Sequence, residues 1–289
     1  MKVMMLSAGE LFSGHKCYKN NSKQPFSNWN RLLVYNCILY NMKKLSLFFV
    51  AAILVLSFSA CKKSSEDFQT PALNDYFPLT TGKYITYDLD SLVYINFGTA
   101  TVVHSYQVKY EVDSLITDNL GRPAYRIFRY IRNTATAAWV PDNTFMAVNI
   151  STSLEFIENN MRFLKLKQPV RDTYSWKGNT YIDTYSTNSL LHYMDDWDYI
   201  YDSVGVQTQV GNFTLDNTLI VNQRDEVIGN PSDPNAYAEV NYAQEKYAAG
   251  IGMVYKKFFH SEYQPPVPNL GGHFADGSYG ITLTMIDHN

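Results

Sequence analysis

Four potential metal ligands lie close together in the sequence: His192, Asp195, Asp196 and Asp198. Carboxylate oxygens are the ligands that Ca²⁺ prefers in proteins, so this stretch is a candidate cation site. Its spacing lacks the central glycine and the terminal glutamate of a calcium-binding loop. A solvated acidic loop explains the same four residues, and it is the interpretation we adopt. The sequence therefore predicts no metal and no other cofactor.

Signatures of catalysis do not stand out elsewhere in the chain. There is no Gly-x-Ser-x-Gly elbow, and no cysteine follows Cys61 to serve as a thiol nucleophile. Gly250-Ile251-Gly252 lacks the third glycine that a dinucleotide-binding turn requires. Paired carboxylates for glycoside hydrolysis stay open, because their separation is a property of the fold. We favour a protein that is not an enzyme and keep a glycan-acting hydrolase as an alternative.

Cys61 carries the clearest chemical signal. An apolar run, Leu45–Phe58, follows two lysines and is shorter than the roughly 20 residues of a membrane span. It has the layout of a secretory signal peptide. The run ends in Phe58-Ser59-Ala60-Cys61, which resembles the lipobox of bacterial lipoproteins, with Phe58 in place of the commoner leucine. The resemblance implies that the Cys61 sulfur receives a lipid and that the chain is cleaved before this residue.

These features predict how the chain is divided. Residues 42–60 are a signal peptide, 61–75 a lipidated tether and 76–289 a single all-β domain. Residues 1–41 precede a segment that belongs at an N-terminus, so we interpret them as an unstructured upstream extension added by a wrong start, with Met42 as the true start. A genuine cytoplasmic extension is the alternative.

Charge narrows the range of partners. Residues 1–60 carry seven Lys or Arg and one acidic residue, whereas the rest of the chain carries 17 basic and 26 acidic residues. An acidic exported part makes nucleic acid an unsuitable partner. The expected partner is a membrane, held through the lipid on Cys61. Lys62 is not the aspartate that retains enteric lipoproteins in the inner membrane. This favours the outer membrane, with its periplasmic face and the cell surface both left open.

Strand signals fill the remainder of the chain. Tyr106, Val108 and Tyr110 alternate with polar residues, and a turn at 118–123 leads to a return strand at 124–132. Residues 236–249 are ambiguous, because their composition favours helix while their tyrosine spacing fits neither period, and we interpret them as a strand. A short helix is expected within 186–196. Further strands are expected from residue 84 and over 101–115, 139–149, 152–167 (two strands around a turn at 158–160), 197–204, 212–223, 253–259 and 279–286, with a hairpin over 172–183.

About ten strands with little helix predict an all-β fold, an antiparallel, strongly curved sheet or open barrel. Three short motifs resemble uncharacterised outer-membrane lipoproteins of the Bacteroidota. They are Tyr76-Phe77-Pro78-Leu79 with Gly82, the Gly250-Ile251-Gly252 feature, and Asp276-Gly277-Ser278-Tyr279 near the C-terminal end. The resemblance implies the export route and an all-β domain, and it implies no activity.

The expected function is that of a lipid-anchored cell-envelope protein, a non-catalytic binding or structural module whose ligand is unknown. A glycan and a lipid are both open as ligands. One alternative is a carrier of an apolar ligand, similar to periplasmic lipoprotein carriers with a curved sheet over a cavity. The other is the glycan-acting hydrolase.

Overall fold

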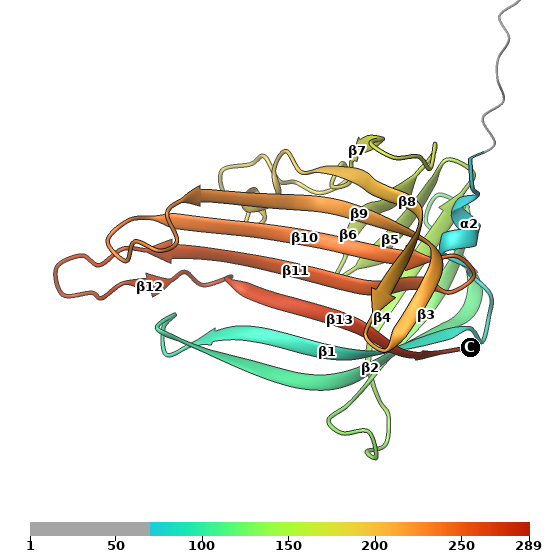
Figure 1. The fold of residues 1–289 in the computed structure, drawn as a ribbon, viewed down its shortest axis with the longest axis horizontal. Coiled ribbons are helices and arrows are strands. Elements are labelled where there is room, and N and C mark those ends of the chain that lie inside the picture. Colours follow the sequence, from blue (N-terminus) through green and yellow to red (C-terminus); the bar gives the residue numbers. More distant parts are fainter. Residues whose placement is uncertain (1–69) are drawn as a thin grey trace, which may run out of the picture. The chain divides into compact units, whose positions relative to one another are not determined.

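Antiparallel strands make up almost all of the described chain. The computed structural model describes residues 70–289 (Figure 1). Its helical elements are α2 (Leu73–Tyr76) and the 3₁₀ turn η1 (His192–Met194). The strands are β1 (Tyr84–Ile95), β2 (Ala100–Thr117), β3 (Pro123–Arg132), β4 (Val140–Ile150), β5 (Ser153–Glu158), β6 (Met161–Lys167), β7 (Ser175–Lys177), β8 (Asp198–Val210), β9 (Phe213–Gly229), β10 (Ala238–Ala248), β11 (Gly252–Gln264), β12 (His273–Phe274) and β13 (Tyr279–His288). The all-β prediction is confirmed.

All of these strands belong to one sheet. Its order is β6-β5-β4-β3-β2-β1-β13-β11-β10-β9-β8-β7, and β12 pairs with β11 off this path. Nearly every neighbour in the sheet is also a neighbour in sequence, so the sheet is built from hairpins. The exception is β13, which lies between β1 and β11 and joins two arms of hairpins. The sheet curls until it is nearly closed, as the prediction of a strongly curved sheet or open barrel required.

The two edge strands of the sheet, β6 and β7, meet along a seam. The Leu164 amide of β6 donates to the Gly178 carbonyl at 2.8 Å, and the Trp176 indole N–H donates to the Leu164 carbonyl at 2.8 Å. The Tyr201 hydroxyl accepts from the Lys167 amide at 2.9 Å and donates to the Lys167 carbonyl at 2.8 Å. These bonds satisfy backbone groups that an open edge would leave available for pairing with another chain.

Strand burial follows the two-residue period. In β13, which covers the strand expected over 279–286, Leu283 and Met285 are buried and Ile281 is half-buried. The ambiguous stretch 236–249 is a strand, because β10 pairs along its whole length with β9 and β11. Tertiary pairing thus overrides the helix-favouring composition of this stretch.

Two local predictions need correction. The hairpin expected over 172–183 is wrong: only Ser175–Lys177 is a strand, and it pairs with β8. A turn follows at 178–181, but no return strand forms after it, and the Gly178 carbonyl accepts a bond from the Leu164 amide of β6 across the seam. The helix expected within 186–196 is reduced to η1. Strands β8 and β9 also extend further than predicted, to Val210 and Gly229.

The predicted export segments lie outside the described residues. These are the extension at 1–41, the signal peptide at 42–60 and Cys61. Within residues 70–289, no helix is long enough and apolar enough to cross a membrane.

Candidate functional site

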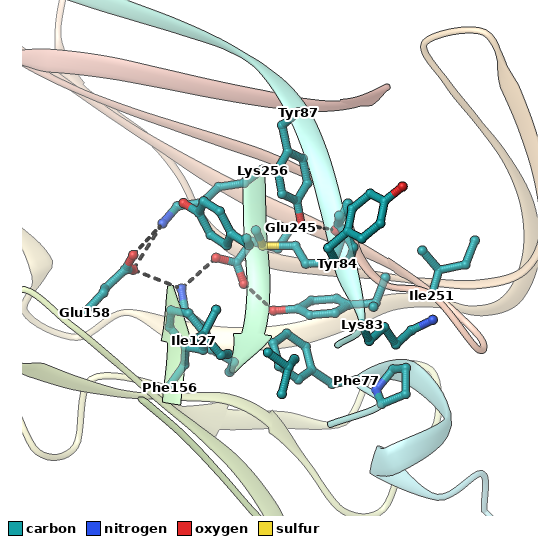
Figure 2. Close-up of a pocket in the computed structure, with 18 residues that line it drawn as sticks. Phe77, Lys83, Tyr84, Tyr87, Ile127, Phe156, Glu158, Glu245, Ile251 and Lys256 are labelled. Carbon is teal, nitrogen blue, oxygen red and sulfur yellow. Dashed lines mark hydrogen bonds and ion pairs between the residues drawn. The ribbon is translucent and has the colours of Figure 1, made fainter. Parts of the chain in front are cut away.

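The inner face of the curved sheet holds a cavity of about 60 Å³ between β1, β5, β6, β10 and β11 (Figure 2). We call this cavity the chamber. One water needs roughly 10–15 Å³ of such volume, so the chamber admits a few waters or the end of a small ligand. Most of its wall is aromatic or aliphatic, with contributions from Phe77, Tyr84, Tyr87, Tyr110, Ile127, Phe156, Tyr247, Ile251 and Met253.

Five charged side chains interrupt this apolar wall: Lys83, Glu158, Lys165, Glu245 and Lys256. The Lys83 ammonium donates to the Asn289 main-chain oxygen at 2.7 Å in an exposed bond, and the other four contact one another. The Lys165 ammonium lies 2.6 Å from a Glu245 carboxylate oxygen and 3.6 Å from Glu158. Glu158 also pairs with Lys256 at 3.1 Å, so the four groups form one chain of contacts (Figure 2). Glu245 is fully buried and Lys165 is 6% exposed. Within this chain of contacts, two carboxylates are matched by two ammonium groups.

The strand period explains why these charges point inward. Along β10, Ala243, Glu245 and Tyr247 are buried on one face. On β6, Lys165 lies two residues after buried Phe163 and so shares its face. Ions of opposite sign in an apolar interior must pair, since an isolated buried charge costs several kcal/mol in desolvation. The Lys165–Glu245 pair thus links β6 to β10, which are not neighbours in the sheet.

The surroundings keep Glu158 and Lys165 ionised. Burial alone would raise the pKa of the Glu158 carboxyl, but the Lys256 and Lys165 ammonium groups outweigh it and lower the pKa to about 2. Burial alone would lower the pKa of Lys165, but Glu245 and Glu158 outweigh that effect and raise the pKa above its ordinary value. Glu158 therefore stays negative and Lys165 positive throughout the physiological pH range.

Buried tyrosines complete the polar lining. The Tyr247 hydroxyl donates to Glu245 at 2.5 Å, and the Tyr87 hydroxyl donates to the Met253 carbonyl at 2.6 Å. Burial raises the pKa of both phenols well above the ordinary value, and Glu245 adds to the effect at Tyr247. Burial likewise raises the pKa of Tyr110 to about 12. All three phenols are neutral hydrogen-bonding groups at physiological pH.

A second cavity, of about 100 Å³, shares Glu158, Lys165 and Lys256 with the chamber. Gln223 lines it and is only 4% exposed, and its Nε2 has no hydrogen-bond partner among the described residues. Gln223 lies at a bulge of β9, where Asn222 and Arg224 pair with consecutive residues of β10. Bulges re-aim side chains and are common beside binding sites. The wall of the second cavity therefore contains a buried donor without a partner among the described residues.

The candidate metal ligands do not converge. The Lys177 ammonium lies 3.2 Å from Asp196 and 3.3 Å from Asp198, in the position that a cation between these carboxylates would take. His192 Nδ1 lies 2.9 Å from the Thr184 carbonyl, and Asp195 accepts a bond from the Thr184 hydroxyl. Across residues 70–289, no group of three or more His, Cys, Asp or Glu is arranged to hold a metal ion.

Sequence reasoning missed the chamber. The available signal was a single lysine in the apolar run Phe163-Leu164-Lys165-Leu166, together with a glutamate between two buried positions of β10. Either residue alone predicts little, because only the fold shows that β6 faces β10 across the chamber.

Comparison with protein-family models, with curated proteins and with solved structures finds no match to the chain.

Proposed function

We propose that this protein is a lipid-anchored, non-catalytic binding module of the bacterial cell envelope, and that its chamber binds a small polar ligand without net charge. The proposal rests on the two carboxylates and two ammonium groups that pair with one another in the largely apolar wall of the cavity. Ligand sites in proteins combine apolar walls with a few placed polar groups in this way. A neutral or zwitterionic ligand adds no uncompensated charge to the chamber.

The pKa values favour binding over acid–base catalysis. A general acid or base works best when its pKa lies near the operating pH. Glu158 has a pKa of about 2, and that of Lys165 is raised, so neither exchanges a proton readily at neutral pH. A module that binds a ligand without catalysis fits these two pKa values better than a hydrolase does.

Size and polarity favour a small polar ligand over the apolar cargo of a carrier. Pockets that enclose a drug-sized ligand usually measure about 300–1,000 Å³, whereas the chamber measures about 60 Å³. An acyl chain could not hydrogen-bond to the charged groups in the wall of the chamber, so it would gain nothing from them.

The anchor rests on the lipobox at Cys61 and on the resemblance to Bacteroidota lipoproteins. It is tested by growing expressing cells with a fatty-acid analogue and comparing the parent chain with Cys61→Ala. We expect the label on the parent alone, and with it fractionation to the outer membrane. Equal labelling of the two chains would contradict the anchor.

Ligand binding is tested on the detergent-extracted full chain with a panel of monosaccharides and zwitterionic amino acids. We expect at least one compound to raise the melting temperature. Lys256→Met should weaken that response at least tenfold, because Lys256 lines both cavities. Lys257→Met is the matched control, since Lys257 is the next residue and is exposed. A response that Lys256→Met leaves unchanged would place the ligand outside the chamber.

A further inference from the structure

Three hairpin tips gather at the end of the sheet opposite α2 (Figure 1). A row of paired residues marks the boundary of this end, running from Val93 through Tyr279 and His260 to Asn241 and Glu226. We call the residues beyond that row the distal end. It comprises residues 93–102, 226–241 and 260–279.

Contacts between the tips make the distal end one surface. The Phe274 amide of β12 donates to the Gly98 carbonyl of the β1–β2 tip at 2.9 Å. The Phe274 ring lies 4.5 Å from the ring of Tyr94 and 5.2 Å from that of Tyr263. The Tyr263 hydroxyl then reaches the Pro234 carbonyl in the β9–β10 loop. The three tips are therefore positioned before any partner arrives, which lowers the entropic cost of binding.

Apolar side chains concentrate on this surface. Seven of the 15 exposed large hydrophobic residues lie in these 46 of the 220 described residues. Single exposed hydrophobic residues are ordinary, but a cluster marks an interaction site. The seven residues are Ile95, Phe97, Val227, Ile228, Tyr237, Val267 and Leu270.

Phe97 is the most informative of them. Its side chain is 95% exposed, so it contributes almost nothing to the core. Its backbone has a φ of 56°, in the left-handed region that is costly for a bulky residue. A residue that costs conformational energy and buries no surface is better explained by contact with a partner than by folding.

Charge selects the kind of partner. The distal end carries five carboxylates, Glu226, Asp233, Glu239, Glu262 and Asp276, and no lysine or arginine of its own, while Glu226 pairs with Arg224 just outside it. A second copy of the same surface would bring like charges together. Anionic lipid headgroups would meet the same repulsion, and membrane-surface segments are usually rich in Lys and Arg. We infer that the distal end docks onto a partner protein whose contact surface has an apolar centre surrounded by Lys and Arg.

The arrangement of the domain leaves this surface accessible. The β10–β11 turn at the opposite end bonds to α2 through the Gly250 amide and the Asp75 carbonyl, at 2.7 Å. The described chain begins at Thr70, beside α2, and continues back toward Cys61. Under the proposed anchor, the tether thus joins the end remote from the docking surface. The surface itself is defined within residues 93–279 and does not depend on Cys61.

The test places a photoreactive phenylalanine at Val267 in the full chain, in cells that express it. The same group at Leu190 is the matched control, because Leu190 is 93% exposed and lies outside the distal end. We expect position 267, and not position 190, to form an adduct with one protein whose cross-linked peptide contains Lys or Arg. The adduct is also measured with the Cys61→Ala chain, so that a failure of the proposed anchor can be told apart from a failure of the docking surface.

Two further variants decide whether the adduct reports the proposed chemistry. Phe97→Gly removes the exposed ring and relieves the positive φ. It should lower the adduct at least tenfold while the melting temperature stays the same or rises. Glu239→Lys with Asp276→Lys should lower it similarly, whereas Asp202→Lys with Asp216→Lys on β8 and β9 should not. An adduct with lipid or with a second copy, equal adducts at both positions, insensitivity to these variants, or no adduct at all would overturn the inference.

Discussion

The chamber and the distal end treat charge in opposite ways. In the chamber, each carboxylate lies beside an ammonium group, and the four charges cancel. The distal end has five carboxylates and no lysine or arginine of its own, and among the described residues only Glu226 pairs with a basic side chain, that of Arg224. Water explains the difference: a buried ion must be paired, whereas an exposed one is stabilised by solvent. The chamber can therefore act only at contact distance, while the distal end retains a field that steers a partner from afar.

The two regions also differ in what their side chains contribute. Those of the chamber contribute to stability, and those of the distal end to recognition of a partner. Removing a fully buried group such as Glu245 from the chamber should damage the fold, because partners enclose it. Removing a group from the distal end should leave the fold intact and affect only association.

Deletion of Tyr279–Asn289 should have the largest effect, because β13 joins the two arms of the sheet. The deletion separates β1 from β11 and removes buried Leu283 and Met285. Burial of each such side chain is worth about 1.5–3 kcal/mol, against a total stability of about 5–15 kcal/mol. We expect no cooperative melt by circular dichroism, whereas deletion of residues 1–41 should leave the melt unchanged. A truncated chain that melts like its parent would show that β13 is dispensable.

Glu245→Gln should have the next largest effect. It leaves Lys165 buried with only the more distant Glu158, and breaking a buried pair costs about 3–5 kcal/mol. Urea unfolding measures this loss. The double variant Lys165→Met with Glu245→Leu is the control, since it removes both charges together and should restore most of the stability. A double variant as unstable as the single one would show that packing, not charge, maintains the chamber.

Acid should destabilise the chamber over a defined range. The pKa of Glu158 is lowered from 4.5 to about 2 in the folded protein, so the folded state binds fewer protons than the unfolded state. The stability that Glu158 contributes is fully present above about pH 4.5 and is lost as pH falls toward 2. Unfolding free energies from pH 6 to 2 should show a loss that is smaller in Glu158→Gln. Equal slopes in the two proteins would exclude this carboxyl as the source.

Phe97→Gly should have the smallest effect on stability, within about 1 kcal/mol and in the favourable direction. Glycine adopts a positive φ without steric cost, and Phe97 buries almost no surface. Thermal melts of the two proteins are the measurement. A large loss of stability would show that the β1–β2 tip supports the fold, which would end the contrast between the two regions.

Alternation and turn residues in the sequence predicted the strands and hairpins that local interactions determine. The alternation at Tyr106, Val108 and Tyr110 identified β2, and the turn at 118–123 identified its hairpin with β3. The hairpin over 172–183 failed because a bond across the seam, from Leu164 to Gly178, decides the path of the chain there. Such a bond has no local signature.

The candidate site was harder to predict for the same reason. Lys165 and Glu245 are 80 residues apart in sequence and meet only when the sheet curls. The carboxylates near His192 were conspicuous because they are adjacent in sequence, yet Lys177 pairs with two of them. The residues near His192 are adjacent in sequence but do not form a metal site in the fold. Lys165 and Glu245 are far apart in sequence but meet in the chamber.

The central position of β13 also sets an order of events in time. The hairpins of β1 to β6 can form as soon as that part of the chain emerges, and so can those of β7 to β11. The edges of β1 and β11 nevertheless stay uncovered until the last strand is available, because only β13 pairs with both. Folding therefore cannot finish before residue 288 has left the ribosome or translocon. Since contacts between distant parts of a chain form slowly, a newly made molecule passes through a period in which two open sheet edges are exposed to chaperones, proteases and other copies.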